Sequence, residues 1–252
     1  MVQNVLLTKI ISPPRQARAL ARPRLMDIFL QAYDYRLTIL QAEAGYGKST
    51  ALTELAEITK PLAWYQVNED DNDPLVFLLH LCHAVAHAMP NMQDLPLHFL
   101  ETWDGSQGPL PWRSVTDQVI NALCAHLDTP IILVIDDAHI VTESGEVAHI
   151  IDRLVGMAPA NLHVILSGRP VISLPNLPRW RSQGEMMLVD QTALIFSADE
   201  ISALFSTHYG LELSQEEVDS LVTYTEGWAI ALQLIWQSIR GHFPSAIEFP
   251  KH

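Results

Sequence analysis

Cysteine, basic charge and long apolar runs are all scarce in this sequence. Its two cysteines, Cys82 and Cys124, form no C-x-x-C unit and both fall in apolar helical patterns, which predicts buried free thiols in a reducing compartment. No apolar run approaches the ~20 residues that a membrane-spanning helix needs. The N-terminus lacks the basic start and the long apolar core of a signal peptide. We therefore expect a soluble, cytoplasmic protein that makes no membrane contact.

The shortage of positive charge bears on the partners of the chain. Fifteen Lys and Arg residues against twenty-nine Asp and Glu residues give a formal net charge of -14. This balance argues against direct nucleic-acid binding by this chain, because neutralisation of phosphates by Lys and Arg dominates such affinity. DNA binding by a module outside this chain stays open. At 252 residues and 48% hydrophobic, the chain can form one large domain or a domain plus a smaller one.

The stretch from Leu37 to Thr50 carries the strongest chemical signal. An apolar strand-like run ends at Gln41, a loop with two glycines follows, and residues 50–58 have helical spacing. This is the context that a phosphate-binding loop of the Walker A type requires. Backbone N–H groups at a helix N-terminus favour a bound phosphate. The candidate nucleotide-binding residues are Ala44, Gly45, Tyr46, Gly47, Lys48, Ser49 and Thr50, with Ser49 also a candidate Mg²⁺ ligand.

The loop departs from the pattern G-x-x-x-x-G-K-[ST] at one position, where Ala42 replaces the first glycine. Alanine is the smallest substitute. The alternative is a chance loop before a helix, with Lys48 as an ordinary lysine of the first turn. A lysine is electrostatically unfavourable at a helix N-terminus, which favours a bound anion beside it.

A second motif follows a continuous apolar run at residues 131–135. Such a run is typical of a parallel strand buried on both faces, and Asp136 and Asp137 come directly after it. The carboxyl ends of parallel strands are where open α/β sheets bind ligands. The pair is therefore a candidate Walker B motif, in which Asp136 would hold Mg²⁺ and Asp137 would orient or deprotonate the attacking water. The alternative is a strand followed by an acidic turn.

Arg169 follows another buried run, at residues 162–168. An arginine at this edge of the sheet could sense a γ-phosphate or neutralise charge during transfer. It could equally be a surface ion-pair partner, and both interpretations stay open.

Two stretches invite a metal interpretation. Residues 68–74 are rich in acids, but an EF-hand loop counted from Asp70 lacks its glycine and its bidentate glutamate; Asp73 as a helix cap before Pro74 fits better. His80, His83 and His87 share one side of a predicted helix over 74–89, a spacing that could hold a transition metal. A polar helix flank is the commoner outcome, and no matching cluster lies nearby in the sequence.

The order of patterns predicts a three-layer, parallel α/β sheet of five strands, followed by a small helical domain. The strands are expected at residues 37–41, 62–67, 131–135, 162–166 and 186–189, with helices between them. Residues 8–18 and 91–113 are expected to be irregular. Strand patterns stop after Asp190, and capping boxes at Ser197 and Ser214 begin helical patterns. We therefore expect domains at 1–192 and 193–252.

Taken together, the motifs resemble the nucleotide-binding core of the signal-transduction ATPases with numerous domains (STAND), and within that class the MalT-like transcriptional activators. Tyr46 between the two glycines and the pair Gly227-Trp228 are more selective than a bare Walker A motif. The resembling stretches run through nearly the whole chain: 42–50, 64–74, 133–139, 166–169 and 225–229.

The resemblance implies ATP or ADP with Mg²⁺, used as a signalling switch with weak ATPase activity. It implies that Lys48, Ser49 and Thr50 hold phosphates and metal, that Asp136 and Asp137 are the Walker B acids, and that Arg169 is a sensor. Arg22 matches a short N-terminal motif that approaches the adenine, with Ala21 in place of its glycine. A guanine-specific site is disfavoured, because no N-K-x-D segment occurs.

The resemblance further implies sensor and DNA-binding output modules, which are absent from this chain, so we expect a fragment or a reduced relative. It also implies nucleotide-dependent self-association. The alternative function is a motor or remodelling ATPase with continuous turnover. The helix that begins near Gly227 is expected to face the nucleotide, with Trp228 either beside the base or filling the domain interface.

Overall fold

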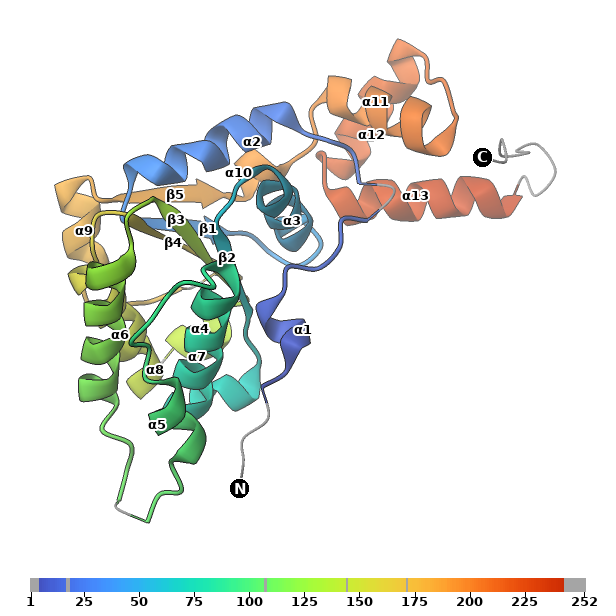
Figure 1. The fold of residues 1–252 in the computed structure, drawn as a ribbon. Coiled ribbons are helices and arrows are strands. Elements are labelled where there is room, and N and C mark those ends of the chain that lie inside the picture. The colour runs from blue at the N-terminus through green and yellow to red at the C-terminus, as the bar shows by residue number, and fades with distance from the viewer. Residues whose placement is uncertain (1–4, 17–18, 107, 144, 171, 243–252) are drawn as a thin grey trace.

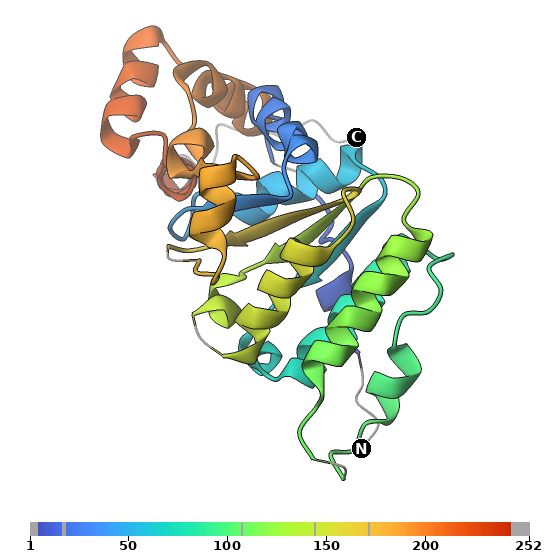
Figure 2. The same ribbon diagram turned by 90° about the vertical axis from the view of Figure 1, so that its left-hand side faces the viewer.

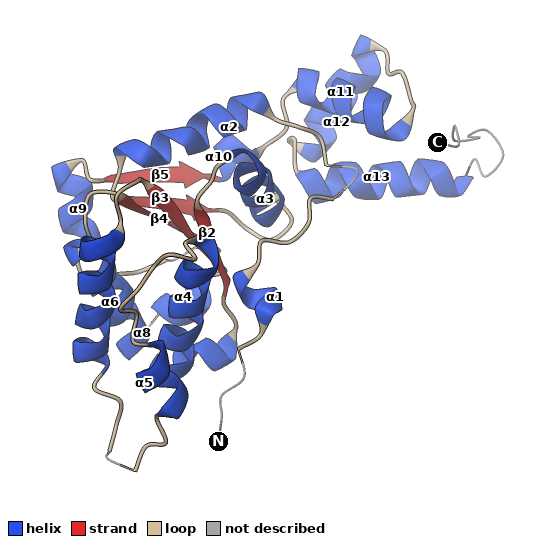
Figure 3. Cartoon of the chain, in the orientation of Figure 1, coloured by secondary structure: helices blue, strands red, loops and turns tan. Residues whose placement is uncertain are grey.

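The computed structural model describes residues 5–16, 19–106, 108–143, 145–170 and 172–242. At its centre lies a five-stranded parallel sheet (Figures 1 and 3). The strand order is β2-β3-β4-β1-β5, so that β1, which precedes the glycine loop, lies between β4 and β5. The strands are β1 (Leu37–Gln41), β2 (Leu62–Gln66), β3 (Ile131–Asp136), β4 (Leu162–Gly168) and β5 (Met186–Asp190).

Helices cover both faces of the sheet, as the two views show (Figures 1 and 2). Helices α2 (Pro23–Leu30) and α3 (Lys48–Ile58) pack on one face, and α4 (Pro74–Ala88), α6 (Trp112–His126) and α8 (Glu146–Met157) pack on the other. The three-layer α/β architecture expected from the sequence is therefore confirmed.

Strand β3 shows how the sheet positions its polar end. All six of its residues are buried, as a central parallel strand requires. Because side chains alternate along a strand, Ile132 and Val134 join the core cluster on the α2 and α3 face, while the odd-numbered residues join the cluster opposite. The same alternation directs Asp136 towards α3.

Local sequence signals account for the helix starts. Pro74 takes the first position of α4, and the carboxylate of Asp73 accepts hydrogen bonds from the N–H groups of Leu75 and Val76, as the capping interpretation predicted. Both predicted capping boxes also form: Ser197 pairs with Glu200 and Ser214 with Glu217.

Three expectations were wrong. The lead-in contains a short helix, α1 (Leu7–Ile10), and the region 91–113 contains α5 (Leu97–Thr102) as well as the first two residues of α6. Leu100 is buried in α5, so tertiary packing stabilises a helix among breaker residues. Cys124 is exposed, unlike Cys82, because it lies on the outer side of α6. A further short helix, α9 (Leu177–Gln183), was not predicted, although Pro178 in its first turn and Gly184 after its end are typical start and stop signals.

After β5 the chain is helical. Helix α10 (Gln191–Leu194) places Leu194 in the α/β core, whereas α11 (Ala198–Tyr209), α12 (Gln215–Thr225) and α13 (Ala229–His242) pack around a cluster of their own. We call these last three helices the helical unit; it projects from one end of the sheet (Figure 1). The expected division near residue 193 stays a prediction. None of the helices in the described ranges has the length and apolar character to cross a membrane.

Candidate functional site

The glycine loop connects the end of β1 to the start of α3. Gly45 and Gly47 both have φ of +81°, a left-handed conformation that side chains with a Cβ oppose. Gly47 is the N-cap residue of α3, and Lys48 is the first residue of the helix. The loop thus has the strand, turn and helix context that the Walker A interpretation requires.

Lys48 is buried and folds back on its own loop. Its Nζ donates hydrogen bonds to the carbonyl oxygens of Ala42, at 2.7 Å, and Glu43, at 3.1 Å. Burial lowers the pKa of Lys48, and the nearby carboxylates of Asp137 and Asp136 oppose this shift. The ammonium is therefore held at the loop by carbonyls, and these are bonds that a phosphate could replace.

Asp136 joins β3 to the first turn of α3. Its Oδ2 accepts a hydrogen bond from Ser49 Oγ at 2.7 Å, and its Oδ1 accepts one from the N–H of Asp137 at 3.1 Å. The carboxylate is fully buried, and no salt bridge to it occurs among the residues that the structure describes. A buried carboxylate without a cation is costly. The Ser49 and Asp136 oxygens are the donor types that Mg²⁺ prefers, with water completing the shell.

Asp137 lies directly after the strand in a left-handed conformation, with φ of +58°, which is uncommon for a residue other than glycine. Burial, followed by the charge of Asp136, raises the pKa of Asp137. Its Oδ2 accepts a hydrogen bond from Gln66 Nε2 at 2.7 Å, and His139 Nδ1 lies 4.0 Å from its Oδ1. Gln66 was not predicted as a site residue. It is a polar residue at the end of the apolar strand β2, which pairs with β3.

Arg169 follows the last residue of β4, and its side chain is exposed. It is close enough to Lys48 for its positive charge to contribute to the lowered pKa of that lysine. Among the described residues it takes part in no salt bridge. Arg169 is thus a cation near the glycine loop, and its role as a sensor stays a prediction.

Arg22 lies against the start of α11 and the segment that leads into it. Its guanidinium donates to the carbonyl oxygens of Leu194, at 2.8 Å, and Ile195, at 2.7 Å, and pairs with Glu200 at 3.0 Å. Burial lowers the pKa of Arg22, while its bond to Glu200 opposes the shift. Burial also opposes the charge of Glu200, but its hydrogen bonds, first that from Arg22, bring the pKa of Glu200 below its ordinary value.

A pocket of about 250 Å³ lies between the α/β part of the chain and the helical unit. Its lining comes from the N-terminal segment, the glycine loop with α3, and the helical unit, and includes Arg22, Tyr46, Thr50, Glu54 and Trp236. Four of the predicted nucleotide-binding residues therefore line one space: Arg22, Tyr46, Gly47 and Thr50. The pocket lies next to the glycine loop and mixes apolar and polar side chains, as small-ligand sites do.

The start of α13 rests on the glycine loop. The backbone N–H of Ile230 donates to the carbonyl oxygen of Gly45 at 3.2 Å, and Trp228 Nε1 donates to that of Ala44 at 3.3 Å. The rings of Tyr46 and Trp228 lie 6.0 Å apart. Trp228 therefore packs at the interface between the loop and the helical unit. Gly227 makes its close approach elsewhere: a Cβ there would lie 2.5 Å from the carbonyl oxygen of Phe196.

The acidic stretch near Asp71 is explained by an ion pair. The buried carboxylate of Asp71 accepts hydrogen bonds from Lys9 Nζ at 2.7 and 2.9 Å and from Tyr65 Oη at 2.8 Å. The predicted cap Asp73 serves α4. This segment therefore ties α1 to the end of β2.

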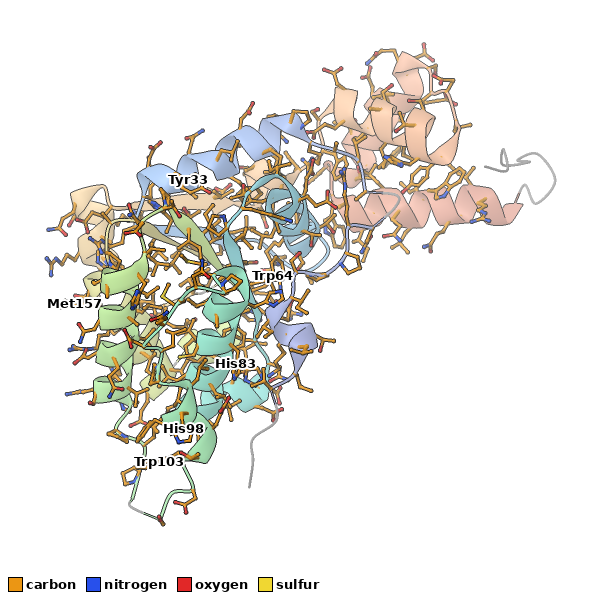
Figure 4. All side chains as sticks on the ribbon, in the orientation of Figure 1. Tyr33, Trp64, His83, His98, Trp103 and Met157 are labelled. Atoms are coloured by element: carbon orange, nitrogen blue, oxygen red, sulfur yellow. The ribbon has the colours of Figure 1, made fainter. Side chains whose placement is uncertain are left out.

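His80 and His83 of α4 have separate partners. His80 Nδ1 bonds to the Val76 carbonyl oxygen at 2.9 Å, and His83, which lies near α5 (Figure 4), is 3.3 Å from a carboxylate oxygen of Glu101. Within the described ranges, no group of three or more His, Cys, Asp and Glu side chains is arranged to hold a metal ion.

The chain is similar in sequence to several known proteins. No protein-family model matches it. It is 33% identical, over 87% of its length, to the serine/threonine-protein kinase PknK of Mycobacterium tuberculosis, of which it covers 20%. It is 30% identical, over 92% of its length, to the HTH-type transcriptional regulator MalT of Yersinia enterocolitica, of which it covers 25%. The chain thus spans a fifth to a quarter of the length of these curated relatives.

Solved structures agree on the fold. A STAND protein with a tetratricopeptide repeat sensor from Pyrococcus horikoshii matches 95% of the chain with a TM-score of 0.62 and 16% identity, over 32% of its own length. The Walker-type ATPase of Pyrococcus abyssi matches 90% with a TM-score of 0.50 and 14% identity, over 69% of its own length. The resemblance indicated by the motifs is confirmed: the chain is similar to MalT-like regulators over most of its length, with the fold of STAND-type P-loop NTPases.

Proposed function

We propose that this chain is an adenine-nucleotide-binding regulatory module in which the state of the glycine loop controls the helical unit. It binds ATP or ADP with Mg²⁺, and slow hydrolysis of ATP makes the nucleotide a switch. The observation that carries this proposal is the direct seating of α13 on the loop, through the carbonyl oxygens of Ala44 and Gly45. A phosphate that rearranges the loop must therefore act on the helical unit as well.

The hydrogen bonds of the loop supply the mechanism. Lys48 bonds to the carbonyls of Ala42 and Glu43, and α13 bonds to the next two carbonyls. When a triphosphate binds, Lys48 turns from the carbonyls to the outer phosphates, because an ammonium forms stronger hydrogen bonds with an anion. Without their bonds to Lys48, the carbonyls of Ala42 and Glu43 allow the loop beneath α13 to change conformation. ATP and ADP therefore differ in how well they stabilise the docked position of the helical unit.

For hydrolysis, the residues at the ends of β3 and β4 divide the work. Ser49 and Asp136 would hold Mg²⁺, which would neutralise the charge of the phosphates. Asp137 orients the attacking water, and Arg169 neutralises charge that develops on the transferred group. We expect turnover to be slow, as a switch requires.

The alternative is a remodelling ATPase with continuous turnover, which uses the same residues. The two are separated by the nucleotide that the protein retains. A switch co-purifies with tightly held ADP and turns over little in isolation, whereas a motor shows steady hydrolysis that rises on assembly. Chromatography of the nucleotide released by denaturing the purified protein, together with the steady-state rate, decides between them.

The partners follow from the proposed role. The relatives are several times longer than this chain, and one of them is named an HTH-type transcriptional regulator. We propose that sensor and DNA-binding modules act together with this module in a full-length regulator, and that self-association depends on the nucleotide. With a net charge of -14, the module itself is not expected to bind DNA.

The coupling is tested by thermal unfolding with and without Mg-ADP. A ligand at a hundred times its Kd stabilises the folded form by about 2.7 kcal/mol, and both parts of the chain should gain this stability together. In Trp228→Leu, which loses the indole bond to Ala44, we expect the helical unit to unfold separately and to gain little from Mg-ADP. Tyr224→Leu is the matched control, since Tyr224 is 85% exposed on the same unit. Equal ADP responses in the two variants would contradict the proposed switch.

A further inference from the structure

The carboxylate of Asp137 has a neighbour on each side, but only one of them forms a hydrogen bond. Gln66 Nε2, at the end of β2, donates to Oδ2 at 2.7 Å. His139 Nδ1, at the start of α7 (His139–Thr142), lies 4.0 Å from Oδ1. This nitrogen is shut away from solvent and has no hydrogen-bond partner among the described residues. An unpartnered buried polar atom is unfavourable, so its position requires an explanation.

The backbone around His139 brings it close to the site. A Cβ on Gly168, the last residue of β4, would lie 3.1 Å from both the backbone nitrogen and the Cβ of His139. A side chain at this position would therefore press against α7, so the glycine favours the close approach of α7 to the end of β4. The result is that His139 lies beside the ends of both β3 and β4, next to Asp137 and to the strand that leads to Arg169.

The geometry is one short movement from a second hydrogen bond. An N–H···O bond has a heavy-atom distance of about 3 Å, so Nδ1 and Oδ1 need to approach by about 1 Å. Asp137 already has a left-handed backbone, a conformation that surrounding contacts must maintain. A second donor opposite Gln66 would fix the carboxylate plane and leave its remaining lone pairs for a water molecule.

We propose that His139 is a positioning residue for ATP hydrolysis, whose Nδ1–H closes onto Asp137 Oδ1 when Mg-nucleotide is bound, so that His139 and Gln66 together fix the carboxylate that orients the attacking water. This inference rests on the proposed function, because it concerns the hydrolytic step of the same site. It assigns a role to the histidine that follows the paired acids. The proposed hydrogen bond requires a proton on Nδ1.

Three substitutions at His139 test the geometry. His139→Asn places an amide N–H near the position of Nδ1, His139→Gln places one near Nε2, and His139→Leu removes the donor. Loss of an outer-shell partner of a metal ligand typically costs about 10–100-fold in metal affinity or activity, and we expect a similar range for a residue that orients Asp137. We expect kcat to fall by about this factor in the Leu and Gln variants, with KM and nucleotide Kd unchanged, and to recover in the Asn variant. Gln66→Leu should lower kcat in the same way.

The controls separate this inference from the proposed function. If the parent and Asp137→Asn hydrolyse bound ATP at the same rate in single turnover, the hydrolytic function is wrong. If Asp137→Asn loses hydrolysis while His139→Leu retains the parental rate, the function stands and the role of His139 is wrong. Equal rates for the Asn and Gln variants would also overturn the proposed role of His139, because a donor at the position of Nδ1 would then make no difference to hydrolysis.

A second measurement needs no turnover. In the ¹⁵N-histidine NMR spectrum of the parent protein, with Mg²⁺ and a non-hydrolysable ATP analogue, we expect His139 to show a protonated Nδ1 hydrogen-bonded to an acceptor. The signal is assigned by its absence in His139→Asn. An unprotonated Nδ1, or a His139 signal that does not respond to the analogue, overturns the proposal.

Discussion

Gly45 and Gly47 form a natural pair for measuring the contact between the glycine loop and the helical unit. Both have φ of +81°, but their surroundings differ: a Cβ on Gly45 would lie 2.8 Å from Ile230 Cγ2, whereas a Cβ on Gly47 would have nothing within 4 Å. Replacing either with alanine imposes the same backbone strain. Only Gly45→Ala also forces α13 away from the loop.

The expected magnitudes follow from these two terms. A residue with a Cβ in the left-handed region costs about 1–2 kcal/mol, and overpacking a close contact adds about 1–3 kcal/mol. Gly47→Ala should therefore lower the free energy of unfolding by about 1–2 kcal/mol and Gly45→Ala by about 2–5 kcal/mol. The difference between the two variants measures the clash with α13.

Urea unfolding of the nucleotide-free chain provides the assay, with Ile230→Ala as the relieving change. Ile230 is 39% exposed, so the single substitution should cost little. Combined with Gly45→Ala, the Ile230→Ala substitution should restore about 1 kcal/mol or more of the free energy of unfolding, a coupling typical of residues in contact. Combined with Gly47→Ala, it should restore no stability. Equal losses in the two glycine variants, or no coupling to Ile230, would refute the idea that α13 rests on the loop.

Three further predictions concern single charged groups. Lys48→Ala should abolish ATP binding in calorimetry while the fold is kept, with the exposed Lys60→Ala as control; undiminished affinity would remove the phosphate-loop assignment. Asp137→Asn should retain ATP binding and lose hydrolysis, whereas Asp136→Asn should weaken Mg²⁺-dependent binding; equal effects on binding would contradict the division of roles. The pKa of Glu200 is lowered on folding, so its stabilisation is complete above its unfolded pKa of about 4.3 and is lost as pH falls through the lower folded value. Glu200→Gln should therefore destabilise the chain near pH 7 and much less once the pH lies below the folded pKa of Glu200, as measured by urea unfolding.

Much of the fold could be predicted because its signals are local. Buried parallel strands appear as continuous apolar runs, and β3 and β4 were recognised on that basis. The caps of α4, α11 and α12 depend on side chains within three residues of the helix start. The meeting of Ser49 with Asp136 followed from the rule that parallel strands gather their carboxyl ends at one edge.

What could not be predicted depends on neighbours that are distant in the sequence. Gln66 meets Asp137 only because β2 pairs with β3, and nothing near Gln66 in the sequence indicates that pairing. Cys124 sits in an apolar pattern whose buried side is set by packing of α6. The start of α13 was expected to face the nucleotide site, but its hydrogen bond from the N–H of Ile230 to the loop is a backbone contact, which no side-chain pattern encodes.

The position of β1 within the sheet has a consequence for how the protein is made. Leu37 pairs with Val164 on one side and with Met186 on the other, so β1 leaves the ribosome long before either partner strand exists. Strands β2 and β3 can pair earlier, but the strand that leads into the glycine loop must wait with two open edges. Such edges template aggregation, and distant pairings form slowly. The nucleotide site is therefore among the last parts of this chain to assemble during synthesis, and chains interrupted before β4 should be those that chaperones or proteases remove.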